Sequence, residues 1–277
     1  MKFAKYHGLG NDFIFVDGRD GLALSPAQAV ALCDRRRGIG ADGVLVAYPP
    51  VTPGAHARMH VWNSDGSIAE MCGNGLRCFV AALGTREREL VIDTNAGPLP
   101  CTVDHDGQIS VRLGRPRLLR GDIPMTGPAD ATCIEQPYTV AGEPERRLTG
   151  VATGNPHAVT FVESSDEARR LASAIGPALE RHPWFPEKAN VEFAYMTSRH
   201  SIDVFVWERA CGLTLACGTG ASAVAVAAVL TDRADAGAPI AVRLPGGTLE
   251  ITVWPGLANV AMRGPCVHVF DGDVDPL

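Results

Sequence analysis

The chain carries the same sequence pattern twice, and this repeat constrains its fold more than any other feature. The segment "VWNSDGSIAEMCGNG" (61–75) aligns without a gap on "VWERACGLTLACGTG" (206–220), at an offset of 145 residues. In this register Val61 falls on Val206, Trp62 on Trp207, Asn63 on Glu208, and Cys72 on Cys217. Because the chain has only four tryptophans, chance agreement is a poor explanation. We interpret the chain as two duplicated halves.

A second landmark recurs upstream of each repeated cysteine. The segment "GLGNDFIFVD" (8–17) resembles "ATGNPHAVTFV" (152–162), so that Asn11 precedes Cys72 by 61 residues and Asn155 precedes Cys217 by 62. Between the two halves, "GRPRLLRGDIPMTGP" (114–128) has the proline and glycine content of a loop or linker. We therefore place the domain boundary near residue 116.

Length and composition narrow the class of protein. A chain of 277 residues is long enough for about two domains. A net charge of -6 argues against a nucleic-acid partner, which would need a basic face. The first residues lack a secretory apolar core, and the apolar run 221–230 is far shorter than the ~20 residues that span a bilayer. We expect a cytoplasmic protein without membrane segments, whose eight cysteines are mostly buried thiols.

Short runs of β-branched and aromatic residues bounded by turn residues predict the strands. These runs are 12–17, 41–48, 57–63, 89–94, 107–113, 157–163, 201–208, 240–244 and 248–254. Helices are expected over 25–36, 73–84, 165–179 and 218–230. The last of these is apolar on all sides, which predicts a helix enclosed by strands. The predicted class is α+β (α/β in some schemes), each half being a curved, mostly antiparallel sheet around one central helix.

In this arrangement Cys72 and Cys217 would each stand at the N-terminus of a central helix. The unpaired N–H groups and partial positive charge there lower a thiol pKa from ~8.5 and bind carboxylates. Two equivalent domains that face each other would bring both thiols to one cleft. One thiolate could then remove a proton from a carbon while the opposite thiol delivers one. This chemistry inverts a stereocentre and needs no metal and no cofactor.

Other interpretations of the cysteines are weaker. Cys72 with Cys78 and Cys211 with Cys217 form two C-x5-C pairs, but structural zinc sites usually have shorter spacings and the repeat does not relate these pairs. A Cys72–Cys78 disulfide is disfavoured because Cys78 falls inside the predicted helix, where its counterpart is Ala223. Either repeated cysteine alone would be interpreted as a small core residue. A thiol sensor or metal-binding module is kept as an alternative of another class.

Longer motifs carry a family resemblance. The segments "GLGNDF", "NSDGSIAEMCGNGLRC", "GNPHAV", "NVEF" and "WERACGLTLACGTGA" resemble the diaminopimelate epimerase family, over residues 3 to at least 221. The resemblance implies cofactor-independent interconversion of LL- and meso-2,6-diaminopimelate, a step in bacterial synthesis of lysine and peptidoglycan precursors. It also implies two pseudo-symmetric domains with the active site in the cleft between them, and commonly a homodimer.

In the family, the C-terminal segment returns to the first domain. The resemblance therefore implies one domain of residues 1–116 plus 265–277 that carries Cys72, and a second of residues 117–264 that carries Cys217. Cys72 and Cys217 match the catalytic pair, and His157 and Glu208 match residues that tune the two thiols. The positions that match substrate-contacting residues are Asn11, Asn63, Gly73, Asn74, Asn155, Asn190, Glu208, Arg209, Gly218 and Thr219.

Elementary chemistry agrees with these assignments. Backbone N–H groups at both helix starts would hold an α-carboxylate, and Arg209 can pair bidentately with a distal one. Asn11 and Asn63 also sit in turn-like sequence, where asparagine often only satisfies the local backbone.

Two positions depart from the family pattern. Gly43 stands where some members have a substrate-contacting glutamine, and Ala210 stands where glycine is usual. If position 210 needs a positive φ, the alanine would be strained. Both departures leave a racemase or epimerase of another amino acid as an alternative, although "MCGNG" and "WER" argue against a proline-type enzyme.

Overall fold

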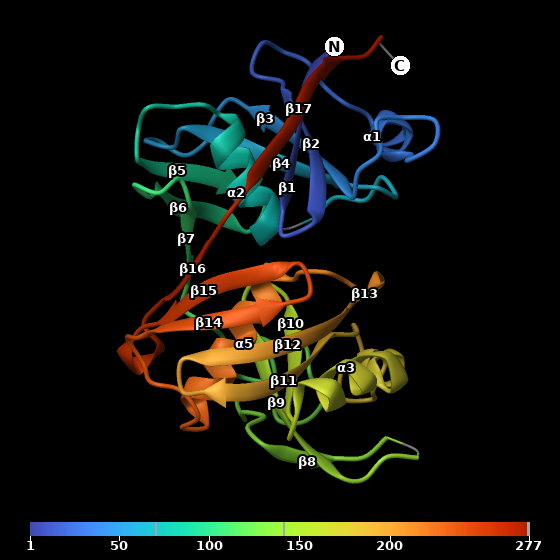
Figure 1. Cartoon of the computed structure of the whole chain (residues 1–277), viewed down its shortest axis with the longest axis vertical. Helices are drawn as coiled ribbons and strands as arrows, with labels where there is room; N and C mark the ends of the chain where they lie inside the picture. The colour runs from blue at the N-terminus through green and yellow to red at the C-terminus, as the bar shows by residue number, and fades with distance from the viewer. Residues whose placement is uncertain (70, 141, 276–277) are drawn as a thin grey trace. The chain divides into compact units, whose positions relative to one another are not determined.

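The computed structural model describes residues 1–69, 71–140 and 142–275. The chain forms two compact units, which Figure 1 shows in ribbon form. Unit 1 comprises Met1–Arg112 and Arg263–Leu277, and unit 2 comprises Leu113–Met262. Each unit contains one of the two repeated cysteines.

Unit 1 is a mixed sheet with two helices packed on it. Its elements are β1 (Lys2–Gly8), β2 (Asn11–Asp17), α1 (Pro26–Cys33), β3 (Gly43–Tyr48), β4 (Ala57–Asn63), α2 (Gly73–Ala82), β5 (Glu89–Thr94), β6 (Gly97–Val103), β7 (Ile109–Gly114) and β17 (Val267–Asp273). The strands pair in the order β17, β1, β2, β3, β4, β5, β6, β7. The β2–β3 and β4–β5 pairs are parallel and the others are antiparallel.

Unit 2 has the same kind of sheet. Its elements are β8 (Gln136–Tyr138), β9 (Arg146–Ala152), β10 (Pro156–Phe161), α3 (Ser165–Ala174), α4 (Gly176–Glu180), β11 (Asn190–Ser198), β12 (Ser201–Glu208), β13 (Gly212–Leu213), α5 (Gly218–Leu230), β14 (Pro239–Leu244), β15 (Gly247–Val253), the 3-10 turn η1 (Pro255–Leu257) and β16 (Val260–Gly264). The main strands pair in the order β8, β9, β10, β11, β12, β14, β15. Here β10–β11 and β12–β14 are the parallel pairs.

The two sheets repeat one topology. From β1 to β6, and again from β9 to β15, the pairs run antiparallel, parallel, antiparallel, parallel, antiparallel. Each parallel pair needs a crossover connection, and helices lie at equivalent points in both units. Thus α1 corresponds to α3 with α4, and α2 corresponds to α5. The pseudo-symmetry predicted from the repeat is confirmed at the level of strand order.

The helices start where the sequence indicates. Ser25 caps α1, and a capping box joins its side chain to the Gln28 backbone N–H and the Gln28 side chain to the Ser25 backbone. The expected helix over 165–179 is instead two helices, because α3 ends at Ala174, with Ile175 as its C-cap, and α4 begins at Gly176. Pro177 explains the break, since a proline cannot donate to the preceding turn and its ring crowds the earlier carbonyl.

Helix α5 is enclosed, as its uniform apolar sequence predicts. Every residue from Gly218 to Ala228 is buried, and the helix contacts strands β9, β10, β11, β12, β14 and β15. Only small side chains allow strands to approach a helix from so many directions. In unit 1, α2 is likewise buried from Gly73 to Val80 and packs against β1 and β2.

All nine predicted strands are found, and several further strands were missed. Strand β1 contains Lys2, Lys5 and His7, and β6 contains Pro98 and Pro100, so neither has the composition of a typical strand. Both are held by their neighbours through pairing rather than by propensity.

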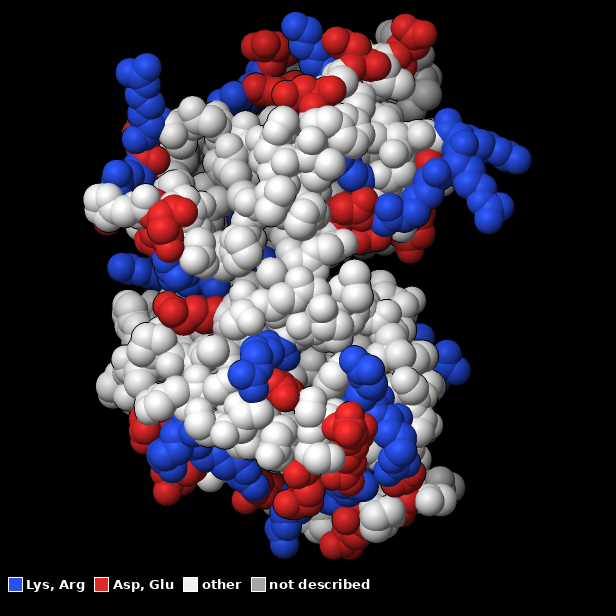
Figure 2. Space-filling model, in the orientation of Figure 1, with Lys and Arg blue, Asp and Glu red and all other residues white. Residues whose placement is uncertain are grey.

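Charges of both signs are interleaved over the face of each unit that Figure 2 shows. In residues 1–69, 71–140 and 142–275, no helix has the length and apolar character needed to cross a bilayer. All eight cysteines lie in these residues, and none of them forms a disulfide there.

Candidate active site

The thiol of unit 1 stands at the start of a buried helix. Cys72 is the N-cap of α2, with an extended backbone, and its Sγ accepts a hydrogen bond from the Gly75 N–H at 3.4 Å. A Cβ built at Gly75 would lie 3.3 Å from that sulfur and 3.0 Å from Leu45 Cδ2. Glycine at this third helical position therefore gives the sulfur room beside the backbone.

Polar side chains surround the Cys72 sulfur within unit 1. Asn11 Oδ1 lies 3.9 Å from Sγ and accepts from Asn74 Nδ2 at 3.3 Å. Asn74 is itself buried, and its Oδ1 accepts from the fully buried guanidinium of Arg77 at 2.8 Å. Arg77 also donates to the carbonyl oxygens of Gly73 and Pro265, both at 3.3 Å. The residues predicted near Cys72 thus form one hydrogen-bonded group.

The thiol of unit 2 is more deeply buried. Cys217 is the N-cap of α5, is 5% exposed, and has its Sγ 3.5 Å from Thr219 Oγ1. Burial raises the pKa of Cys217 well above its ordinary value, and the carboxyl groups of Glu208 and Glu192 raise it further. Burial likewise raises the pKa of Glu208, while the neighbouring Cys217 thiol acts in the opposite direction. This environment favours the protonated form of both groups.

A chain of three hydrogen-bonded side chains, two of them buried, lies against the start of α5. His157 Nδ1 is 2.7 Å from Glu192 Oε1, and His157 Nε2 is 2.8 Å from Asn155 Oδ1. His157 and Glu192 are both fully buried. A Cβ built at Gly220 would lie 2.7 Å from Glu192 Oε1 and 3.3 Å from Cys217 Sγ. Gly220 therefore has the same spatial role as Gly75, its partner in the repeat.

Asn190 connects two parts of unit 2. Its Nδ2 donates to the Pro156 carbonyl at 3.1 Å, and its Oδ1 accepts from the Arg209 backbone N–H at 2.9 Å. Within the described residues, no hydrogen bond or ion pair engages the guanidinium of Arg209. Asn190 thus fixes the backbone from which the Arg209 side chain extends.

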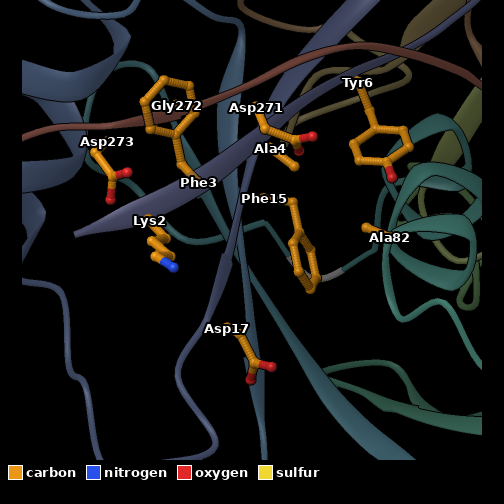
Figure 3. Close-up of a pocket in the computed structure, with 10 residues that line it drawn as sticks. All are labelled: Lys2, Phe3, Ala4, Tyr6, Phe15, Asp17, Ala82, Asp271, Gly272 and Asp273. Atoms are coloured by element: carbon orange, nitrogen blue, oxygen red, sulfur yellow. The ribbon is translucent and has the colours of Figure 1, made fainter.

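A separate hollow lies at the opposite end of α2. Figure 3 shows it lined by Phe3, Tyr6 and Phe15, with Ala82 at the helix end and Asp271 on β17. Since α2 rises ~1.5 Å per residue over its ten residues, its two ends are roughly 15 Å apart. The hollow is therefore distinct from the surroundings of Cys72.

Two segments of the chain match the sequence model of a known family. The sequence model described as diaminopimelate epimerase matches residues 3–119 and 149–269. The chain is 50% identical over 281 residues to the diaminopimelate epimerase of Synechococcus sp. (strain JA-2-3B'a(2-13)), covering 98% of this chain and 97% of the relative. It is 48% identical over 281 residues to diaminopimelate epimerase 1 of Nostoc sp. (strain PCC 7120), covering 98% and 99%.

The chain belongs to the diaminopimelate epimerase family. Its fold also resembles solved structures of more distant proteins. One is a hydroxyproline epimerase from Agrobacterium vitis, with a TM-score of 0.71 at 16% identity over 99% of this chain and 90% of the other. Another is a probable proline racemase from Agrobacterium radiobacter K84, with a TM-score of 0.72 at 16% identity over 99% and 92%. At such low identity these likenesses concern the fold alone.

The structure distributes the family's expected site residues between the two units. Unit 1 groups Asn11, Cys72, Gly73 and Asn74, whereas the side chain of Asn63 donates to Ser67 Oγ at 2.9 Å in the turn after β4. Unit 2 groups the remaining candidates around α5 and β12, namely Asn155, His157, Asn190, Glu208, Arg209, Cys217, Gly218 and Thr219. His157 contacts Glu192 and Asn155, and its expected influence on a thiol stays a prediction.

Sequence reasoning missed two groups that support this site, Glu192 and Asp42. Glu192 lies within the quoted motif "NVEF" but resembled an ordinary strand residue in sequence. Asp42 precedes a strand and resembled a turn residue. Pairing of β10 with β11 and of β2 with β3 brings them beside His157 and Asn11, and this could only be inferred once the strand order was known.

The two departures from the family pattern both have a local explanation. A Cβ at Gly43 would lie 2.6 Å from the Trp62 carbonyl oxygen, so the β3–β4 pair leaves no room for a side chain there. Ala210 has φ = 63°, the left-handed conformation that favours glycine. The expected strain at position 210 is therefore present, and the Ala210 N–H still donates to Glu180 Oε1 at 3.1 Å.

Proposed function

We propose that this chain is an isomerase that interconverts LL- and meso-2,6-diaminopimelate without a cofactor. The observation that carries the proposal is the pair of repeat-equivalent cysteines. Each caps the N-terminus of a buried helix, and each has a glycine at the third helical position, in a chain of the diaminopimelate epimerase family. The relatives named above are diaminopimelate epimerases over nearly the full length of this chain.

In the proposed mechanism the two units face each other, and the substrate carbon lies between the two sulfurs. One sulfur, as the thiolate, takes the α-proton from one face, and the thiol opposite gives its proton to the other face. The two cysteines thereby exchange protonation states, and the reverse direction uses them in the opposite roles. The raised pKa of Cys217 supports its role as the protonated thiol before the first proton transfer, with Cys72 as the thiolate.

Backbone groups and amides would hold the substrate. The N–H groups at the starts of α2 and α5 would bind the α-carboxylate and stabilise the negative charge that develops on proton removal. The Arg209 guanidinium would pair with the distal carboxylate. The distal amino-acid end would be recognised by Asn11, Asn63, Asn155, Asn190 and Glu208. Part of this recognition would come through the backbone that these side chains position.

Deuterium exchange tests this function directly. LL-diaminopimelate is incubated with the enzyme in D2O, and α-deuterium and meso product are followed for the wild type, Cys72→Ala and Cys217→Ala. We expect both readouts for the wild type and no full epimerisation by either variant. Absence of both exchange and meso product in the wild type would refute the proposal. A substrate panel that includes other amino acids would reveal a shifted preference arising from Gly43 and Ala210.

We further propose that the duplicated halves are 1–116 plus 265–277 and 117–264, and that the protein acts in the cytoplasm of a bacterium.

We also propose a homodimer formed along β17. In the described part of unit 1, β17 pairs with β1 along one edge only, and its Val267, Val269 and Phe270 side chains are about half exposed. In a two-fold symmetric dimer, the outer edge of β17 could pair antiparallel with the same edge of the second copy. This pairing would satisfy the backbone hydrogen-bonding groups of both strands.

Sedimentation velocity tests the homodimer. The wild type is expected to sediment with the mass of two chains. The variant Val269→Lys, which places a charge on the proposed interface, is expected to sediment with the mass of one chain. A monomeric wild type, or a variant that stays dimeric, would contradict an interface along β17.

A further inference from the structure

A line of hydrogen bonds runs behind Cys72 and ends in a charged group on each side. At one end, Asn11 Nδ2 donates to Asp42 Oδ2 at 2.8 Å. In the middle, Asn11 Oδ1 accepts from Asn74 Nδ2 at 3.3 Å and faces Cys72 Sγ at 3.9 Å. At the other end, Asn74 Oδ1 accepts from Arg77 Nη2 at 2.8 Å.

The end groups give this line one direction. An ionised carboxylate only accepts hydrogen bonds and a guanidinium only donates them. The Asn11 amide therefore turns its NH2 group toward Asp42, and the Asn74 amide turns its oxygen toward Arg77. Rotating either amide by half a turn would replace its hydrogen bonds with like-to-like contacts. The carbonyl oxygen of Asn11 is in this way left facing the Cys72 sulfur.

Asp42 is itself held firmly. Arg35 Nη2 donates to Asp42 Oδ1 at 2.7 Å and also binds Asp12 Oδ1 at 2.6 Å, so the guanidinium bridges the two carboxylates. The Asp42 backbone N–H donates to the Asp12 carbonyl at 2.9 Å, and its carbonyl accepts from the Ser64 N–H at 3.1 Å. Two backbone hydrogen bonds therefore hold position 42, and the Asp42 carboxylate also accepts from the Asp12 N–H at 3.1 Å.

We propose that Asp42, oriented by Arg35, is a positioning residue that fixes the amide of Asn11 with its carbonyl oxygen toward Cys72. In that orientation the oxygen accepts the S–H of Cys72 and favours the thiol, while the Gly75 N–H on the other side favours the thiolate. The sulfur is balanced between a donor and an acceptor, which suits a group that must both give and take a proton. The contribution to turnover rests on the proposed epimerase function.

The repeat shows that this support belongs to one thiol only. The counterpart of Asn11 is Asn155, whose Oδ1 lies against His157 Nε2 rather than near a carboxylate. The two equivalent asparagines are therefore held by different groups. A change at Asp42 acts on the Cys72 half of the site and leaves the residues around Asn155 in place.

A double-mutant cycle on kcat/KM tests the positioning role. Asp42→Ala is expected to lower kcat/KM about tenfold in the wild-type background and less than about twofold when Asn11→Ala is already present, because the two residues act through one contact. Asp42→Asn keeps an acceptor oxygen and is expected to restore most of the activity. The control Asp235→Asn breaks a surface ion pair of similar exposure, with Arg199 at 2.6 Å, and is expected to leave kcat/KM unchanged. Additive losses for Asp42 and Asn11 would overturn the proposal.

A second measurement needs no substrate and so separates this proposal from the proposed function. The rate at which iodoacetamide alkylates Cys72 is followed against pH by mass spectrometry of its peptide. In Asp42→Ala the Asn11 amide loses the acceptor of its NH2 group and is held by Asn74 alone. Its oxygen then faces the sulfur for less of the time, so the midpoint is expected to fall by about half a pH unit or more. Arg77 and Cys78, which also act electrostatically on Cys72, are unchanged in the variant. An unchanged or raised midpoint would overturn the proposal even if the enzyme epimerises diaminopimelate.

Discussion

The two repeat-equivalent tryptophans offer a matched pair of substitutions. Trp207 Nε1 donates to Glu180 Oε2 at 2.9 Å, and Glu180 is only 4% exposed. Trp62 stands at the corresponding place in unit 1, but its buried Nε1 has no hydrogen-bond partner in the described residues. Replacing each by phenylalanine removes the same ring atoms in both units, and only one substitution removes a hydrogen bond.

The difference between the two variants can be estimated from these contacts. A hydrogen bond to a charged group contributes about 1.5–3 kcal/mol, and Trp207→Phe would leave one oxygen of a buried carboxylate without that donor. Trp62→Phe instead removes an N–H whose burial without a partner costs about 1–3 kcal/mol. The loss of ring volume is common to both. Trp207→Phe is therefore expected to lower the free energy of unfolding by at least about 2 kcal/mol more than Trp62→Phe.

Urea unfolding followed by far-UV circular dichroism measures this difference, since fluorescence would be altered by the substitutions themselves. Hydrogen exchange with mass spectrometry assigns each loss to its own unit, because the two units need not unfold together. Equal losses in the two variants, or a larger loss for Trp62→Phe, would refute the assignment of a stabilising role to the Trp207–Glu180 contact.

Three further predictions concern strain and charge. Ala210→Gly removes the strain of a left-handed alanine, which costs ~1–2 kcal/mol. The glycine also makes the unfolded chain more flexible, which destabilises the folded state by ~0.4–1 kcal/mol. The free energy of unfolding should therefore rise by about 1 kcal/mol, and an unchanged urea midpoint would contradict this. Burial raises the pKa of Cys101 to about 12, so its thiol contributes stability that is complete below pH ~8.5 and is lost as pH rises. In Cys101→Ala the free energy of unfolding should fall less steeply with rising pH than in the wild type, by ~1.4 kcal/mol per pH unit. Urea midpoints measured between pH 9 and 11 would show this difference. Burial acts to raise the pKa of Asp12, but hydrogen bonds from Arg35 and Lys5 outweigh it and hold the pKa well below its usual range. The stabilisation by Asp12 is complete above pH ~4 and decreases progressively on acidification. Asp12→Asn should therefore destabilise clearly less at pH ~2 than at pH 7, and an equal loss of unfolding free energy at both would count against this assignment.

Much of the fold could be predicted because the repeat and the strand composition act together. The register that aligns Cys72 with Cys217 also aligns α2 with α5, and the structure shows these helices at equivalent points of two equivalent sheets. The placement of Cys78 was predicted for the same reason, and it is fully buried within α2. Strand β1 was missed because its charged residues are tolerated only through pairing with β2 and β17, which no local pattern reveals.

The immediate surroundings of the thiols were less predictable. Motifs place Asn11 and Asn155 near the helix starts, but the groups that orient them come from strands distant in sequence. Glu192 reaches His157 across 35 residues, and Asp42 reaches Asn11 across 31. A hydrogen-bond partner of this kind follows from strand order and register, which a single sequence does not specify.

The pairing of β17 with β1 has a consequence for folding during translation of the chain. β17 pairs along β1, the N-terminal amine donates to the Val274 carbonyl, and Arg77 binds the Pro265 carbonyl. Unit 2 is a single continuous segment, Leu113–Met262, whereas unit 1 needs residues from both ends of the chain. Domains usually fold in the order in which the ribosome releases them. Unit 1 can complete its sheet only after β17 has been translated, which is later than all of unit 2.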